Sequence, residues 1–334
     1  MGELVRKGIL NFINKSTPMT ISEIDDLLDS IKDREDMVNQ KKDLYNPYNR
    51  LTIKEISLKI EDASKQMEEI FNFISESGQI PLEEIQESIL PTIKQAAEIP
   101  HVYHLFYELN AKDEYTYRHT ICVGIIANLI GKWLNLEPQD LEDLTLGATL
   151  HDIGKTKIRT EILNKPGKLT KEEYEEMRLH TVYGYELLKN IESIDEEIAL
   201  IALQHHERED GKGYPLGLES DQISYFSKIV AVADVFHAMS SSRVYHQPSP
   251  FYTVMKQMQK DAYGKLEPTI VLTFLNKMMN SLVGKRVLLT DKTVGTITMI
   301  NPYDPIRCLI QVDGHHVDLR YNSQIQIERI IEDE

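Results

Sequence analysis

Five histidines and two aspartates lie in the middle of the chain, at intervals that place them on successive predicted helices. They are His119, His151, Asp152, His180, His205, His206 and Asp234. Neutral imidazole is a ligand for zinc, iron, manganese or nickel, and a carboxylate can bridge two cations through its two oxygens. These residue types therefore permit a centre of two metal ions.

Four of the candidates form two adjacent pairs, and this adjacency limits where they can lie. Neighbouring residues on a regular helix point about 100° apart, so both reach one site only at a helix end or a distortion. Gly154 follows the pair His151–Asp152, and a glycine-rich loop begins near Asp210, just after the pair His205–His206. We therefore expect each pair at the end of a helix.

Several short motifs connect these residues in a fixed order. They are His151-Asp152-Ile-Gly-Lys155, the single His180, His205-His206-Glu-Arg-Glu-Asp-Gly-Lys-Gly213-Tyr214-Pro215, and Ala233-Asp234-Val-Phe followed by Ser242-Arg243-Val-Tyr245. A Gly-Tyr-Pro tripeptide alone indicates only a turn, whereas together with the upstream motifs it is a specific signal. Over about residues 100 to 280 the chain resembles the HD-GYP subfamily of HD-domain phosphohydrolases.

The resemblance implies an all-helical domain that hydrolyses cyclic di-GMP at a cluster of metal ions, usually iron or manganese. By similarity, the metal ligands are the seven residues His119, His151, Asp152, His180, His205, His206 and Asp234. Asp152 is expected to bridge two ions, and the expected cofactor is a pair of divalent ions, Fe or Mn.

The same resemblance implies roles for residues around the metals. Asp152 and Lys155 are the expected catalytic residues, and the expected substrate-binding residues are Lys155, Arg243, Tyr214, Arg208 and Lys212. Metals lower the pKa of bound water from 15.7 to about 7, so metal-bound hydroxide is the expected nucleophile. Lys155 and Arg243 would neutralise the non-bridging phosphate oxygens, whose charge grows in the transition state.

Three positions depart from the family pattern. Tyr115 stands four residues before His119, where members with three metals have a glutamate, so we expect two metals and linear pGpG as the main product. His237 stands where aspartate is common, and a substitution on the helix surface accounts for it as well as a functional role does. His246 replaces a Lys or Arg, which weakens an expected phosphate contact or makes it depend on pH.

Two alternatives remain open at the level of the sequence. One keeps the metal chemistry and changes the substrate, to cyclic GMP-AMP or to a nucleotide monophosphate, because the groups that distinguish bases lie on loops. The other is a catalytically weak sensor that binds the dinucleotide. The seven intact ligand positions favour the enzyme.

Composition restricts the partners and the location. The chain of 334 residues has 37 Lys and Arg against 53 Asp and Glu, a net charge of −16, which opposes binding to nucleic acid or anionic lipid. Cys122 and Cys308 are the two cysteines, which fits a reducing cytoplasm. The most apolar stretch, from Ile121 to Gly131, is too short to span a bilayer, and we expect no signal peptide.

The hydrophobic pattern predicts a mainly α protein in three parts. Residues 1–98 form an N-terminal helical region for regulation or dimerisation, 99–280 the HD-GYP domain, and 281–334 a small β module. Helices are expected at 117–134, 138–151, 169–190, 195–206 and 223–239, with a capping box at Thr170–Glu173. Strands are expected at 286–289, 294–300, 307–312 and 316–319. We expect cyclic di-GMP as partner and a homodimer.

Overall fold

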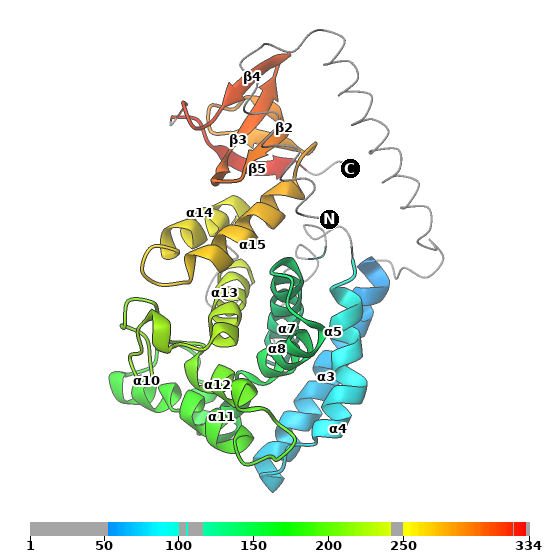
Figure 1. Cartoon of the computed structure of the whole chain (residues 1–334), viewed down its shortest axis with the longest axis vertical. Helices are drawn as coiled ribbons and strands as arrows, with labels where there is room; N and C mark the ends of the chain where they lie inside the picture. Colours follow the sequence, from blue (N-terminus) through cyan, green and yellow to red (C-terminus); the bar gives the residue numbers. More distant parts are fainter. Residues whose placement is uncertain (1–52, 100–104, 106–115, 242–249, 323, 332–334) are drawn as a thin grey trace, which may run out of the picture. The chain divides into compact units, whose positions relative to one another are not determined.

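The computed structural model describes residues 53–99, 105, 116–241, 250–322 and 324–331. The predictions made for Tyr115, Arg243 and His246 lie outside these residues, as does the part of the N-terminal helical region before Ile53. Within them the fold is mainly helical and ends in a small antiparallel sheet, so the predicted fold class is confirmed (Figure 1).

The first described helix, α3 (Ile53–Ser77), is long and amphipathic. Its apolar residues recur every three or four positions, and this stripe is buried at Ile56, Ile60, Met67 and Ile74. A short helix α4 (Leu82–Glu84), a π-helical turn η2 (Ile85–Ile89) and α5 (Leu90–Ala96) follow. Both α3 and α5 pack on α7 (Thr116–Trp133) and share its hydrophobic core.

The helix α7 lies at the centre of the core. Every residue from 118 to 131 is buried, which agrees with the mainly apolar sequence from Ile121 onward. Its neighbours include α8, α13 and α15. The other helices that carry candidate residues are α8 (Pro138–Leu150), α11 (His180–Leu188), α12 (Glu196–Gln204) and α13 (Tyr225–Ser240).

The prediction of a single helix over 169–190 is wrong, because the structure has two helices there. They are α10 (Lys171–Arg178) and α11, and Leu179 separates them. The capping box is confirmed: Thr170 and Glu173 exchange side-chain to backbone hydrogen bonds at the start of α10. The break lets α11 begin at His180, which places that side chain at a helix end. Short turns η3 (Ile153–Lys157), α9 (Thr160–Leu163) and η4 (Ser220–Gln222) complete the connections.

The C-terminal sheet is antiparallel throughout, with strand order β4-β3-β2-β1-β5. Its strands are β1 (Arg286–Leu289), β2 (Val294–Asn301), β3 (Asp304–Val312), β4 (His315–Asp318) and β5 (Ile327–Ile331). The four predicted strands are confirmed. The fifth was missed, because its side chains do not alternate between buried and exposed.

Two helices connect the sheet to the helical core. They are α14 (Phe251–Asp261) and α15 (Pro268–Asn280), and both contact strands. The buried Tyr252 hydroxyl donates a hydrogen bond to the carbonyl oxygen of Ile306 at 2.7 Å. Among the described helices, none combines the length and apolar character needed to cross a lipid bilayer.

A close backbone contact fixes the turn after α8 against α11. A Cβ atom added to Gly154 would lie 1.9 Å from the carbonyl oxygen of His180 and 2.4 Å from the amide nitrogen of Gly184. Only glycine therefore allows η3 to approach the start of α11. This approach brings His180 beside the pair His151–Asp152.

We expect Gly154→Ala to lower the free energy of unfolding by about 1–3 kcal/mol or more, because the added methyl group meets backbone atoms that cannot rotate away. The matched control is Gly184→Ala, whose Cβ would lie 3.0 Å from the Ala202 side chain and 3.4 Å from the nitrogen of Gly154. Urea denaturation measures both variants. Equal losses would contradict this explanation.

Candidate metal centre

Both adjacent pairs lie at helix ends, as their geometry requires. Helix α8 ends at Leu150, and His151 is its C-terminal cap residue; α12 ends at Gln204, and His205 is its cap. Asp152 then leaves helical geometry, with φ −98° and ψ 8°. The second member of each pair can therefore reach the same region as the first.

The seven candidate residues converge, and Asp152 lies between them. Its Oδ2 is 3.3 Å from Nε2 of His151 and 3.7 Å from Nε2 of His119. Its Oδ1 is 3.4 Å from Nε2 of His180 and 3.9 Å from Nε2 of His205. One carboxylate thus presents one oxygen to each of two histidine groups.

The second aspartate, Asp234 on α13, also faces both groups. Its Oδ1 lies 3.1 Å from Nε2 of His119, and its Oδ2 lies 4.0 Å from Nδ1 of His206. Two sets of potential ligand atoms lie within 4.8 Å of one another, one from His119, His151 and Asp152 and one from His180, His205 and His206. The arrangement matches two neighbouring cation sites.

Backbone hydrogen bonds orient three of the histidines. Nδ1 of His151, His180 and His205 lies 2.7, 2.7 and 3.0 Å from the carbonyl oxygen three residues earlier. A carbonyl oxygen only accepts, so Nδ1 carries the ring proton and Nε2 keeps its lone pair. All three Nε2 atoms point toward Asp152, the orientation that a metal ligand needs.

Two atoms at the centre lack a hydrogen-bond partner within the described part of the chain. They are Nε2 of His151 and Oδ1 of Asp152, both buried. Nε2 atoms of His180 and His205 approach each other to 3.4 Å, although both have lone pairs there. Such groups are costly to bury without a partner, and divalent cations would satisfy them. The residues present therefore fit a metal centre.

The protonation states also suit metal binding. Burial lowers the pKa of His180 to about 4 and that of His206 to about 3, and it holds the pKa of His205 well below its ordinary value. Burial opposes ionisation of Asp152, but the charge of Lys155 and the interaction with the His151 ring outweigh burial and hold the pKa of that carboxyl well below its usual range. At neutral pH His180, His205 and His206 are therefore neutral and Asp152 is charged, which are the forms that bind metals.

A buried carboxylate holds the loop that contains Gly213-Tyr214-Pro215, which we call the signature loop. Glu207 accepts hydrogen bonds from the backbone nitrogens of Leu216, Gly217 and Leu218 at 2.7, 3.1 and 3.0 Å. The loop also passes against Glu207 at Gly213, where an added Cβ would lie 2.4 Å from the Cα of Glu207. The loop is therefore fixed from the residue that directly follows His206.

The expected substrate residue Tyr214 lies over the metal centre. Its ring centroid is 4.7 Å from that of His206, and the guanidinium of Arg178 lies 4.8 Å from the Tyr214 ring. The peptide bond from Tyr214 to Pro215 is cis. Burial raises the pKa of the Tyr214 hydroxyl, so this group stays protonated and available as a hydrogen-bond donor.

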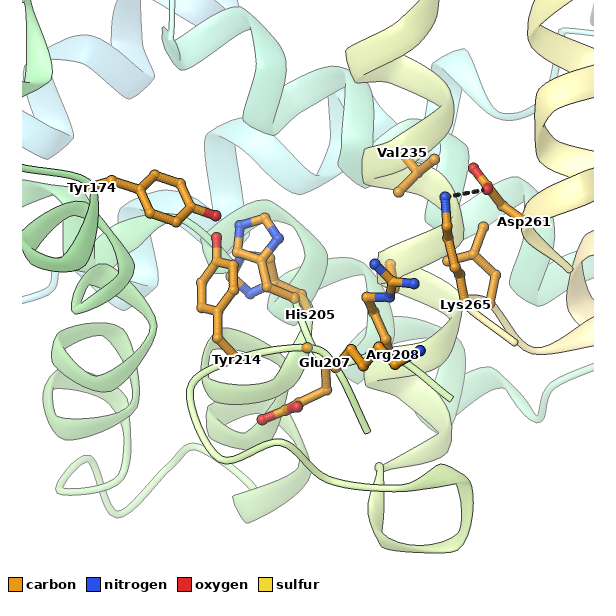
Figure 2. Close-up of a pocket in the computed structure, with 13 residues that line it drawn as sticks. Tyr174, His205, Glu207, Arg208, Tyr214, Val235, Asp261 and Lys265 are labelled. Carbon is orange, nitrogen blue, oxygen red and sulfur yellow. Dashed lines mark ion pairs between the residues drawn. The ribbon is translucent and has the colours of Figure 1, made fainter. Parts of the chain in front are cut away.

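A cavity of about 340 Å³ opens beside the histidines (Figure 2). Its wall combines histidines, basic residues, aromatic rings and apolar side chains from α13, including His206, Arg208, Lys212, Tyr174, Tyr214, Val235 and Lys265. Arg208 and Lys212 both lie near Asp210, at 2.9 and 3.7 Å. Tyr174 and Tyr214 direct their hydroxyl groups toward each other in the same view.

Lys155 contacts the central carboxylate, and its expected phosphate contact stays a prediction. Its Nζ lies 2.6 Å from Oδ2 of Asp152, and its side chain is largely buried. Lys155 thus compensates the charge of the central carboxylate. Arg243, the other expected phosphate contact, lies outside the described residues.

Sequence reasoning missed two residues of the site. Glu207 carried no signal of its own beyond its position after His206. The surface interpretation of His237 is wrong, because its side chain is 2% exposed and its Nδ1 lies 2.9 Å from Nδ1 of His119. Its position three residues after Asp234, on the same face of a helix, was the available signal.

Comparison with known proteins agrees with this geometry. Residues 94–270 match the HD domain family. The chain belongs to this family. It is 40% identical over 172 residues to a cyclic di-GMP phosphodiesterase of Thermotoga maritima, covering 50% of this chain and 47% of the relative. It is 33% identical over 188 residues to a 3'3'-cGAMP-specific phosphodiesterase of Vibrio cholerae, covering 55% and 40%.

This HD-domain chain spans about half the length, or less, of the curated relatives it matches. Among solved structures, an HDG"Y"P protein from Bdellovibrio bacteriovorus has a TM-score of 0.52 at 18% identity, covering 72% of this chain and 78% of that one. This likeness supports the fold.

The buried neutral histidines make the metal-free protein sensitive to acid. Unfolded histidine has a pKa near 6.5, whereas His180 in the fold has a pKa of about 4, so the unfolded chain binds more protons between these values. Stability is therefore full above pH 6.5 and falls toward pH 4, by about 3 kcal/mol from His180 alone. Urea denaturation of chelator-treated protein across this range measures the loss. A flat profile would refute it.

We expect Glu207→Gln to loosen the signature loop, because the amide keeps only one of two accepting oxygens. Hydrogen bonds to a charged group contribute about 1.5–3 kcal/mol, so exchange of the Leu216, Gly217 and Leu218 amides should accelerate about tenfold or more. Hydrogen-exchange mass spectrometry resolves this segment. Glu186→Gln, which removes an exposed partner of Lys189, serves as control and should leave the loop unchanged.

Proposed function

We propose that this chain is a metal-dependent phosphodiesterase that hydrolyses cyclic di-GMP. The observation that carries the proposal is the placement of Asp152, whose two oxygens face separate histidine groups with lone pairs directed at it. The printed functions of the curated relatives, phosphodiesterases of cyclic di-GMP and of 3'3'-cGAMP, support the same class of reaction.

The proposed cofactor is a pair of divalent ions, Fe or Mn. Their ligands would be the seven converging residues, with Asp152 shared between the two ions: His119, His151, Asp152, His180, His205, His206 and Asp234. When bound, such ions neutralise phosphate oxygens and lower the pKa of water to about 7. Neutral imidazoles and ionised carboxylates match this donor set.

The chain's own residues would then bind and orient the nucleotide. Arg208 lines the cavity, and its buried Nε has no hydrogen-bond partner among the described residues, so it offers a donor to an anionic oxygen. Lys212 adds an exposed cation at the same wall. The Tyr214 ring provides an apolar face and a hydroxyl donor above His206. These cations act locally against the net charge of −16.

Lys155 has a second role in this proposal. It compensates the charge of Asp152 at 2.6 Å, and with metals bound to that carboxylate it would be close enough to the centre to contact a phosphate oxygen. We retain Lys155 and Asp152 as the proposed catalytic residues. Arg243 is retained as a phosphate contact on the strength of its motif position alone.

The proposed main product is linear pGpG, because Tyr115 offers no carboxylate four residues before His119 for a third metal. We also propose a cytoplasmic location, which the two buried free cysteines support. The homodimer and the division into residues 1–98, 99–280 and 281–334 stay predictions.

The test is anaerobic purification, reconstitution with Mn²⁺ or Fe²⁺, and chromatography of the products from equal amounts of cyclic di-GMP and 3'3'-cGAMP. We expect about two metals per chain and faster hydrolysis of cyclic di-GMP. Faster hydrolysis of 3'3'-cGAMP would make 3'3'-cGAMP the preferred substrate of the same phosphodiesterase reaction. Binding of the dinucleotide without turnover would favour a sensor, and absence of metal binding would overturn the proposal.

We expect Asp152→Asn to abolish hydrolysis and to reduce bound metal to below one ion per chain, because an amide cannot supply an anionic oxygen to both groups. The matched control, Asp140→Asn, changes an exposed aspartate in the first turn of α8, the helix that precedes Asp152, and should keep both properties. Metal analysis and product assays measure the two variants. Full metal content in Asp152→Asn would contradict the proposal that both ions share Asp152 as a ligand.

A further inference from the structure

The histidine His119 is oriented differently from its neighbours. His151, His180 and His205 direct Nδ1 at backbone carbonyl oxygens, so the helix backbone sets their ring orientation. Nδ1 of His119 instead lies 2.9 Å from Nδ1 of a side chain, His237. Nδ1 of His119 therefore contacts a side chain, which a mutation can change, whereas Nδ1 of the other three rings contacts the backbone.

We propose that His237 is the positioning residue that orients His119 toward the metal centre. The proposal rests on the proposed metal centre and adds a residue outside the seven ligands. His237 is 2% exposed and His119 is 6% exposed, so their ring contact is shielded from water. The ring centroids lie 5.0 Å apart.

The packing of α7 against α13 creates this contact. Asp234 and His237 lie three residues apart on one face of α13, and both reach the same ring on α7 from different sides. Asp234 Oδ1 lies 3.1 Å from Nε2 of His119, while His237 lies at its Nδ1. The two nitrogens of one imidazole thus meet two side chains of a single helix.

The position of the proton between the two rings defines the role of His237. Two facing nitrogens can share only one proton, so one ring donates and the other accepts. For Nε2 of His119 to bind a cation, its Nδ1 must carry the proton and donate it to Nδ1 of His237, which then carries its own proton on Nε2. His237 is therefore an acceptor, and a neutral one.

The chemistry of the side chain indicates which substitutes would work. Nδ1 of histidine and Oδ1 of asparagine or aspartate are each bonded to Cγ, so they project an acceptor from the same place. Leucine puts a methyl group there, with no lone pair. His237→Asn and His237→Asp therefore preserve the acceptor, and His237→Leu removes it with a side chain that still fills buried space.

The test measures Mn²⁺ binding to the full chain, stripped with chelator, by titration against a competing fluorescent chelator. Removal of an orienting partner of a metal ligand typically costs 10–100-fold in affinity, so we expect about this loss for one Mn²⁺ in His237→Leu. His237→Asn should stay within about threefold of wild type, and His237→Asp should bind at least as tightly because it adds a negative charge.

Thermal unfolding of the metal-free variants separates orientation from general damage. If His237→Leu and His237→Asn unfold at the same temperature while only His237→Leu binds Mn²⁺ weakly, the positioning role is supported. Wild-type affinity in His237→Leu, or equal weakening in both variants, overturns it. If wild type binds Mn²⁺ and hydrolyses cyclic di-GMP while His237→Leu is unchanged, this inference alone fails. If wild type binds no Mn²⁺, the proposed function fails with it.

Discussion

A single buried carboxylate determines the architecture of the centre. Asp152 is 2% exposed, yet it is ionised, and burying a charge is costly unless opposite charges or strong donors surround it. Lys155 supplies one compensating charge at 2.6 Å. The imidazoles on both sides direct lone pairs at the carboxylate, an arrangement that cations between them would stabilise.

This requirement explains features of the fold that local propensity alone would not favour. The chain stops α8 at Leu150 and α12 at Gln204 and breaks the expected helix at Leu179, so that each histidine lies where its side chain can turn inward. Gly154 then permits a backbone approach that any larger residue would prevent. Five of the seven candidate residues thus lie at helix ends, whereas His119 and Asp234 lie within α7 and α13.

Different hydrogen bonds hold the residues of the centre and the wall of the cavity beside it. Backbone carbonyl oxygens orient three histidines of the centre, whereas part of the cavity wall is a loop held by Glu207 through three backbone hydrogen bonds. A loop of this kind can vary in its exposed positions, such as Lys212, without disturbing the ligands. The candidate metal ligands and the loop that lines the cavity are thereby held by separate sets of hydrogen bonds.

The sequence by itself determined the mainly helical class, most strands of the β module, the capping box at Thr170 and the set of residues that converge, because periodicity, caps and motif spacing are local signals. Only the tertiary structure decided that Lys155 faces Asp152, that Glu207 holds the loop and that His237 contacts His119. Those contacts join residues through helix packing and chain reversals, and the distance between two side chains on different helices is set by the core rather than by sequence separation. A buried histidine on α13 looks like a surface substitution until α7 is packed against it.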